Sequence, residues 1–254
     1  MTSPLLSFQL YTARASDSLD TQLAELAAMG ITNVEPFGEL YADLDGLHSI
    51  LAQHNMTALS GHFDLEMLEA EPARAIEIAR RLGMKTIIAP WLEPEDRPVD
   101  LAGWQALAAR LLAVGDQMRA GGFIFAWHNH EFEFEPLPCG TMPIEVIMNE
   151  AGCALELDVA WVVRAGGDPL MWIERYAERI IAVHVKDIAP EGQNLDQDGW
   201  TNVGQGIVDW PAVWAMLPKT GARLAILEHD EPKDWLDFAT QSSAAVRQLD
   251  GVAV

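Results

Sequence analysis

The chain is poor in basic side chains for its size. It carries 16 lysines and arginines against 38 aspartates and glutamates, which gives a formal net charge of −22. A field of this sign repels the phosphates of nucleic acids, so we expect no nucleic-acid partner. It also disfavours a polyanionic substrate, unless a local basic pocket outweighs the mean charge.

Cysteines and long apolar runs are scarce as well. The two cysteines, Cys139 and Cys153, are too few for a disulfide framework. No apolar stretch reaches membrane-spanning length, and the N-terminal Met1-Thr2-Ser3-Pro4 lacks the basic region and apolar core of a signal peptide. These absences predict a cytoplasmic protein without a membrane partner.

The common nucleotide-binding motifs are missing too. Gly204-Gln205-Gly206 has no third glycine and no strand before it, and neither a Walker lysine motif nor a G-x-S-x-G elbow occurs. A nucleotide role is therefore not expected.

The sequence does contain a regular alternation of short apolar runs and helical patterns, which builds a parallel sheet. Glycines such as Gly30, Gly83 and Gly152 stop several of the helices just before the next strand. A length of 254 residues, half of them apolar, is usual for an eight-stranded barrel. The pattern predicts a single α/β domain over 1–254, a (β/α)8 TIM barrel with strands at 8–12, 32–37, 58–63, 86–90, 123–128, 154–159, 181–186 and 225–229.

Metal-ligand side chains stand at the ends of four predicted strands. Asp158, His184 and Glu228 each end an apolar run, and a fourth run ends at His128-Asn129-His130. Taken singly, each could be a satisfied core group, a helix cap or an ion-pair partner. One divalent ion would satisfy all four strand ends together, and active sites in such barrels lie where the strands end. The arrangement therefore predicts a metal centre at the mouth of the barrel.

Five longer motifs carry a family resemblance: 127–134 (WHNHEFEF), 156–161 (ELDVAW), 165–169 (AGGDP), 184–187 (HVKD) and 203–210 (VGQGIVDW). Together they resemble the sugar phosphate isomerase/epimerase superfamily with the xylose isomerase-like barrel, which includes inosose dehydratases, ketose 3-epimerases and hydroxypyruvate isomerases. The resemblance covers nearly the whole chain and is specific for the superfamily, but not for a substrate.

The resemblance implies a divalent ion, often manganese, held by groups from strands five to eight. Asp158, His184 and Glu228 match three of these ligands, whereas strand five offers His128-Asn129-His130 in place of the usual carboxylate. Because side chains two apart on a strand share a face, both histidines could reach one ion. We predict His130 as the metal ligand and His128 as a nearby catalytic acid or base. Imidazoles with carboxylates suit Mn²⁺, Zn²⁺, Co²⁺ or Fe²⁺ better than Ca²⁺.

Further side chains at strand ends are candidates for catalysis and substrate binding. Glu35 matches an acidic position of the family and is predicted as an acid/base, with a buried structural carboxylate as the alternative. Lys186 shares the inward face of its strand and is predicted to hold an oxyanion or a hydroxyl. His62, Trp91 and Trp161 are predicted to bind substrate, the tryptophans by stacking on a sugar ring. The segment 190–201 is predicted as a loop, either a lid over the site or plainly solvated.

Residues and resemblance together predict metal-assisted proton transfer next to a carbonyl. The substrate would be a small neutral keto-sugar, cyclitol or 3-keto-glycoside, and the outcome isomerisation, epimerisation or β-elimination by a lyase. One alternative is a hydrolase like the metal-dependent apurinic-site endonucleases, which the negative charge disfavours. Another is a barrel that binds a sugar without turning it over. The sequence leaves the native metal and the oligomeric state open, a homo-oligomer included.

Overall fold

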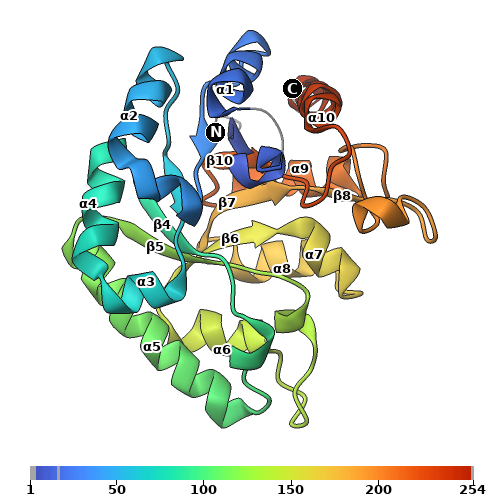
Figure 1. Ribbon diagram of the computed structural model, residues 1–254. Coiled ribbons are helices and arrows are strands. Elements are labelled where there is room, and N and C mark those ends of the chain that lie inside the picture. The colour runs from blue at the N-terminus through green and yellow to red at the C-terminus, as the bar shows by residue number, and fades with distance from the viewer. Residues whose placement is uncertain (1–3, 16–17, 253–254) are drawn as a thin grey trace.

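Eight parallel strands form the centre of the fold (Figure 1). The computed structural model describes residues 4–15 and 18–252. In spatial order the strands are β2 (Val34–Glu35), β1 (Leu5–Gln9), β10 (Leu224–Leu227), β7 (Ile180–Val185), β6 (Ala154–Asp158), β5 (Ile124–His128), β4 (Thr86–Ala89) and β3 (Ser60–His62). A parallel bridge between Asn33 and Thr57 joins the two ends of this order, so the barrel is nearly closed. The structure confirms the predicted (β/α)8 barrel.

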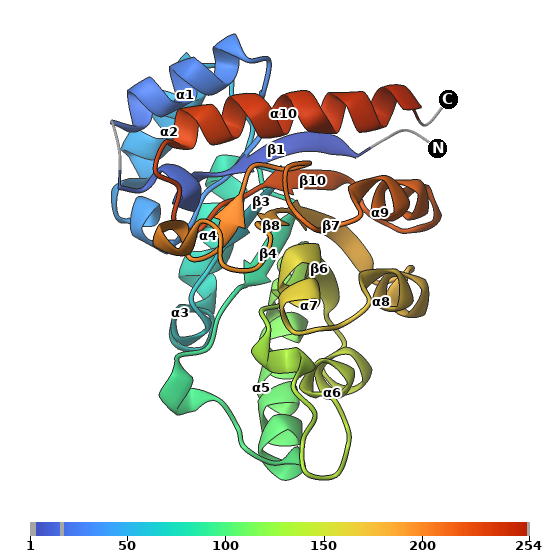
Figure 2. The ribbon, with the colours of Figure 1, turned by 90° about the vertical axis from the view of Figure 1, so that its right-hand side faces the viewer.

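Helices surround the strands on the outside of the barrel (Figures 1 and 2). They are α1 (Leu19–Ala28), α2 (Leu44–Gln53), α3 (Leu65–Ala70), α4 (Pro72–Leu82), α5 (Leu101–Ala120), α6 (Pro143–Glu150), α7 (Val159–Arg164), α8 (Pro169–Tyr176), α9 (Trp210–Met216) and α10 (Trp235–Val252). Figure 2 shows α10 running alongside β1, where the rings of Phe8 and Phe238 lie 6.4 Å apart. No helix in the described ranges is long and apolar enough to cross a membrane.

Local sequence signals set where the helices begin and end. The side chains of Ser18, Asp43 and Asp100 accept backbone N–H groups in the first turns of α1, α2 and α5. Gly83 ends α4 in the left-handed conformation, with φ of 75°, which a residue without a Cβ adopts at little cost. The predicted alternation of glycine stops and strands is therefore present in the fold.

Two segments differ from the prediction. The first strand occupies Leu5–Gln9, not 8–12, because the Gln9 side chain accepts the Tyr11 N–H and starts the 3-10 helix η1 (Leu10–Ala13). The predicted loop 190–201 contains the 3-10 helix η5 (Leu195–Gln197) and ends in β9 (Trp200–Thr201), which pairs antiparallel with β8 (Asp187–Ile188). Trp200 is fully buried and anchors this segment.

The strand register brings the predicted ligands together. Asp158 on β6 is the direct partner of His184 on β7, and Leu227 of β10 is the partner of Val185, which places Glu228 at the next position. Since the eight strands of the barrel are parallel, their carboxyl ends meet at one mouth of the barrel.

Candidate metal centre and active site

Two overlapping groups of metal-ligand side chains meet at this mouth. In each group, the ligand atoms all lie within 4.8 Å of one another. We define the outer group as His128, Asp158, His184 and Glu228, and the inner group as His62, His128, Glu156 and His184. The two groups share both histidines of β5 and β7, and all of these side chains are buried.

The carboxylate of Asp158 is fixed by neighbouring backbone and amide groups. The backbone N–H of Asp158 donates to Asn129 Oδ1 (3.0 Å), and the carboxylate Oδ1 of Asp158 accepts the Trp161 N–H (3.0 Å) at the start of α7. Its Oδ2 is buried and has no hydrogen-bond partner among the described residues. This oxygen lies 3.3 Å from the ammonium of Lys186 and makes no hydrogen bond within the described chain, so it is free to accept one further contact. Together with two imidazoles and a second carboxylate, it makes the outer group able to hold a divalent transition metal.

Lys186 lies on the carboxylate side of the outer group. Its Nζ is 2.8 Å from Glu228 Oε2, 3.3 Å from Asp158 Oδ2 and 2.8 Å from Asp230 Oδ2. Burial opposes the charge, but the three carboxylates outweigh it and raise the pKa of Lys186 above its ordinary value. Lys186 is 1% exposed, so its ammonium is committed to these carboxylates.

Glu156 is the centre of the inner group. Its Oε2 lies 2.7 Å from His62 Nε2, 3.2 Å from His128 Nδ1 and 3.1 Å from His184 Nε2. Burial alone would raise the pKa of Glu156, but the charges on His184 and His62 hold it well below its usual range. Glu156 is therefore an ionised carboxylate enclosed by three imidazole rings.

Glu35 lies beside the inner group, away from the solvent. Its Oε1 is 3.0 Å from Nε2 of both His62 and His184, and it accepts a hydrogen bond from Gln9 Nε2 (2.8 Å). Its Oε2 accepts a hydrogen bond from the Ser60 hydroxyl. Glu35 is fully buried and is not among the residues that line the cavity over the outer group.

A cavity of about 710 Å³ opens over the outer group. A volume of this size accommodates a small ligand. The predicted substrate-binding residues face it together with ligand histidines: its walls include His62, Trp91, His128, His130, Trp161 and Glu228. The predicted sugar-stacking tryptophans are therefore in the wall of the cavity.

His130, predicted as the strand-five ligand, belongs to neither group. Its ring stacks on Phe132 and lies 4.6 Å from the ring of Trp91, and its buried Nδ1 has no described hydrogen-bond partner. Burial, and then the charges on His128 and Lys186, hold the pKa of His130 well below its ordinary value. The geometry thus favours His128 over His130 as the ligand from β5, and His130 lies beside it in the cavity wall.

Sequence reasoning missed two side chains of the site. Glu156 precedes Asp158 by two residues and shares its inward face, and Asp230 follows Glu228 by the same interval and lines the cavity. Burial raises the pKa of Asp230 to about 6, although Lys186 opposes the shift. The two-residue spacing was the available signal for both carboxylates, but it does not show which groups they contact.

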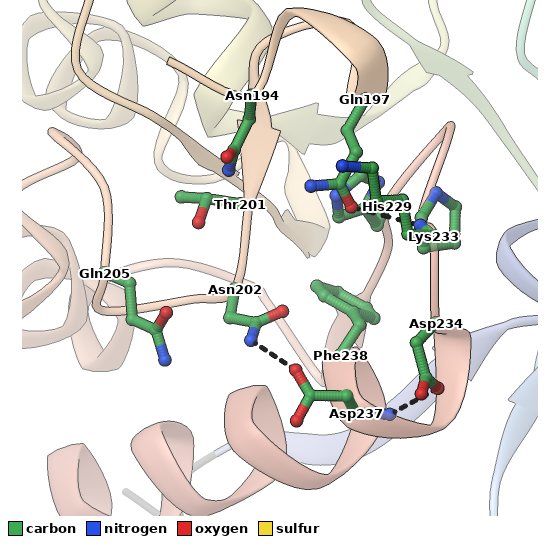
Figure 3. A pocket seen from close by; sticks show the side chains of 11 residues that line it. Asn194, Gln197, Thr201, Asn202, Gln205, His229, Lys233, Asp234, Asp237 and Phe238 are labelled. Atoms are coloured by element: carbon green, nitrogen blue, oxygen red, sulfur yellow. Dashed lines mark hydrogen bonds between the residues drawn. The ribbon is translucent and has the colours of Figure 1, made fainter.

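A second, smaller hollow lies beside the site and is drawn in Figure 3. Its volume is about 290 Å³, and amide side chains from 194–205 line it together with α10. Asn202 donates to Asp237 across it (3.0 Å). Of the histidines at strand ends, His229 faces this hollow, and its Nδ1 accepts the Glu231 N–H. Neither ligand group contributes a residue to its lining.

The fold and the convergent side chains define a (β/α)8 barrel with a candidate metal centre at its mouth. The chain belongs to the family of xylose isomerase-like TIM barrels, whose model matches residues 23–249. This match confirms the resemblance noted in the sequence motifs.

Two proteins of known name are similar in sequence. The rhizopine catabolism protein MocC of Rhizobium meliloti is 25% identical over 242 residues, which cover 81% of this chain and 72% of that protein. An inosose dehydratase of Lacticaseibacillus casei is 26% identical over 137 residues, which cover 46% of this chain and 44% of that protein. The match therefore spans less than half of the inosose dehydratase.

Two solved structures share the fold along nearly the whole chain. A sugar phosphate isomerase/epimerase from Parabacteroides distasonis superposes with a TM-score of 0.81 at 18% identity, covering 97% of this chain and 94% of that one. The IolI protein with a bound zinc atom gives a TM-score of 0.77 at 17% identity, covering 98% and 99%. At these identities the likeness shows the fold alone.

Proposed function

We propose that this protein is a divalent-metal-dependent enzyme that transfers a proton next to the carbonyl of a small keto-sugar, cyclitol or 3-keto-glycoside. The reaction would be an isomerisation, an epimerisation or a β-elimination. The observation that carries the proposal is the outer group, a set of two imidazoles and two carboxylates beneath a cavity that holds a small ligand. The zinc atom in IolI and the dehydratase among the relatives support it.

We assign the ion to His128, Asp158, His184 and Glu228. When bound there, Mn²⁺ or a similar ion such as Zn²⁺, Co²⁺ or Fe²⁺ supplies a Lewis acid that polarises a substrate carbonyl. The buried Oδ2 of Asp158, which makes no hydrogen bond to a described residue and lies 3.3 Å from Lys186 Nζ, supports this assignment. In this assignment, His128 takes the ligand role that was predicted for His130 from the sequence.

We assign proton transfer to His130, the role that was predicted for His128. His130 lines the cavity and belongs to neither ligand group, so its ring is free to accept a proton from the carbon next to the carbonyl. Asp230 also lines the cavity and is the second group placed to move a proton. His62, Trp91 and Trp161 would position the sugar.

Lys186 and Glu35 receive indirect roles in this proposal. Lys186 is surrounded by Asp158, Glu228 and Asp230, so its ammonium would hold these carboxylates in place. It would not bind an oxyanion of the substrate. Glu35 contacts the imidazoles of His62 and His184 and would act through them.

Deuterium exchange tests the proposed reaction. The Mn²⁺-loaded protein is incubated in D₂O with a panel of inososes, ketoses and 3-keto-glycosides, and NMR follows deuterium entry at the carbon next to the carbonyl. We expect exchange with at least one member, abolished by a chelator and by Asp158→Asn. Asp116→Asn on the outside of α5, a matched substitution at an exposed ion pair with Arg119, should exchange like the wild type. If the metal-loaded protein exchanges no deuterium with any of these substrates, the proposed reaction is wrong.

A further inference from the structure

Glu156 contacts the imidazole rings of both histidines in the outer group. One oxygen, Oε2, receives all three imidazole contacts of the inner group, at 2.7 to 3.2 Å. The other oxygen, Oε1, is buried and has no hydrogen-bond partner among the described residues. No backbone N–H is a described partner of this carboxylate, in contrast to Asp158, so its contacts serve the imidazole rings alone.

A neutral imidazole that binds a metal does so through one nitrogen and carries its proton on the other. His128 directs Nδ1 to Glu156, which leaves its Nε2 for the outer group. His184 directs Nε2 to Glu156 Oε2 (3.1 Å) and Glu35 Oε1 (3.0 Å), and its Nδ1 faces Glu228 of the outer group at 2.9 Å. The two histidines therefore present opposite nitrogens to the same carboxylate.

We propose that Glu156 is a positioning residue that selects opposite tautomers of the two ligand histidines. His128 carries its proton on Nδ1 and donates it to Glu156, and His184 carries its proton on Nε2, which Glu156 shares with Glu35. This orients the free ring nitrogens toward the outer group and makes both imidazoles better ligands. The inference rests on the proposed function insofar as the outer group binds an ion.

Glu35 provides a matched control, because it contacts His62 and His184 as Glu156 does but not His128. Its Oε1 lies 3.0 Å from His184 Nε2, whereas none of its described contacts reaches His128. It is also equally buried and equally part of the barrel interior. Replacing Glu35 should weaken the support of one histidine of the outer group, and replacing Glu156 should weaken the support of both.

The first measurement is zinc affinity by competition calorimetry on the purified full chain. Removal of such a carboxylate partner lowers metal affinity about 10- to 100-fold. We expect a loss of about tenfold in Glu156→Gln, which keeps the size and one acceptor oxygen, and about 100-fold in Glu156→Leu, which removes the acceptor. Glu35→Gln should lose less than either. If both Glu156 variants bind zinc within about threefold of the wild type, the proposal is overturned, because such a loss is well below the roughly 10- to 100-fold range. If Glu156→Leu does not fold, Glu156→Gln decides.

The second measurement is a tautomer signature that a merely structural role would not change. Long-range ¹H–¹⁵N NMR spectra of the zinc-loaded protein should show His128 protonated at Nδ1 and His184 at Nε2, in the wild type and in Glu35→Gln. The Nδ1–H signal of His128 should be lost in Glu156→Leu. Finding the proton of His128 on Nε2 in the wild type would refute the proposal. If wild-type protein bound no zinc, the proposed function would fail as well, whereas normal zinc binding with unchanged Glu156 variants would defeat this inference alone.

Discussion

Asp158 and Glu228 are the two carboxylates of the outer group, and both lie close to Lys186. Asp158 Oδ2 lacks a hydrogen bond, and Glu228 Oε2 contacts Lys186 and His184. Replacing either carboxylate by its amide removes a negative ligand oxygen but keeps the size of the side chain. The effect should therefore fall on the ion and not on the fold.

We expect Asp158→Asn and Glu228→Gln to reduce bound divalent metal by about tenfold or more while circular dichroism melts stay cooperative. Elemental analysis of the dialysed variants measures the loss. Glu231→Gln is the control, because its carboxylate is largely exposed and pairs with Arg14 at the rim. Wild-type occupancy in both ligand variants would mean that the outer group is not the metal site.

The two histidines of β5 and the following turn should separate metal binding from proton transfer. His128→Ala is expected to lose both the ion and turnover, because His128 belongs to both ligand groups. His130→Ala should keep the ion and lower the deuterium exchange rate by about 10²- to 10⁴-fold, the usual contribution of a general acid or base. Metal content and exchange rate are measured on the same preparations. The reverse pattern would restore His130 as the ligand.

Glu133 gives the site a pH-dependent stability. Its carboxyl accepts the indole N–H of Trp127 (2.8 Å) and the backbone N–H of His130 (2.9 Å). Burial raises the pKa of Glu133 to about 8, from an ordinary value of 4.5. Between these values the folded protein binds a proton that the unfolded chain has released. The stabilising contribution is therefore complete below pH 4.5 and is lost as the pH rises through about 8.

We expect the unfolding free energy of the wild type to fall relative to Glu133→Gln as the pH rises from about 5 to 8. The difference should change by up to about 1.4 kcal/mol per pH unit, because one proton is involved. Urea titrations across this range measure both proteins. Parallel stability curves would show that Glu133 is already ionised in the folded state.

At the level of elements, Asp187 holds the connection between β8 and α9. Its carboxylate accepts the backbone N–H groups of Ile188 (2.9 Å), Gly204 (2.8 Å), Gly206 (3.2 Å) and Val208 (3.1 Å). A Cβ at Gly206 would collide with this carboxylate, so the close approach requires glycine. Asp187 is thus engaged with the 204–208 segment and is not a partner of Lys186.

Asp187→Ala should cost about 3 kcal/mol of unfolding free energy, because it leaves several buried N–H groups without an acceptor. Asp209→Ala is the comparison, since Asp209 only caps α9 through the Ala212 N–H and should cost about 1 kcal/mol. Urea denaturation measures both. Equal losses in the two variants would contradict the proposed role of Asp187 in the loop.

The elements also explain how far the sequence could predict the site. Asp158, His184 and Glu228 were predictable because each ends an apolar run, and parallel strands bring such ends to one mouth. The ligand of β5 was harder to predict. Side chains two apart lie on one face only if both belong to the strand. In the structure β5 ends at His128. The chain then turns, and His130 joins the aromatic wall of the cavity.

Glu156 was missed for a related physical reason. The sequence predicts a buried strand from Ala154 to Asp158. It does not reveal which side chains of the neighbouring strands will form hydrogen bonds with Glu156. Those partners come from the pairing of β6 with β5 and β7, which places histidines on both sides. The fold was predictable from local periodicity, whereas the inner group depends on contacts between distant strands.

For the whole molecule, the excess of acidic side chains extends into the mouth of the cavity. Its rim includes the carboxylates of Glu39, Asp64, Glu93 and Glu131. The guanidinium of Arg14 lines the same rim but is paired with Glu231 (2.6 Å). The other two cations predicted for a basic pocket, Lys186 and Arg164, are also paired with carboxylates, Arg164 with Asp198 at 2.8 Å. A phosphate group bound by any of these three cations would have to displace an existing ion pair.

We accordingly expect a neutral keto-sugar to be used at least about tenfold better than its phosphate ester at low salt, measured as kcat/KM. Added salt screens the field over about 10 Å at 0.1 M, so the gap should narrow with ionic strength because the value for the ester rises. The value for the neutral substrate should stay nearly constant, since no net charge is attracted or repelled. Steady-state kinetics on such a matched pair at two salt concentrations measures both effects. A preference for the ester, with kcat/KM falling as salt is added, would mean that Arg14 or Arg164 leaves its carboxylate to bind phosphate and outweighs the net charge of −22.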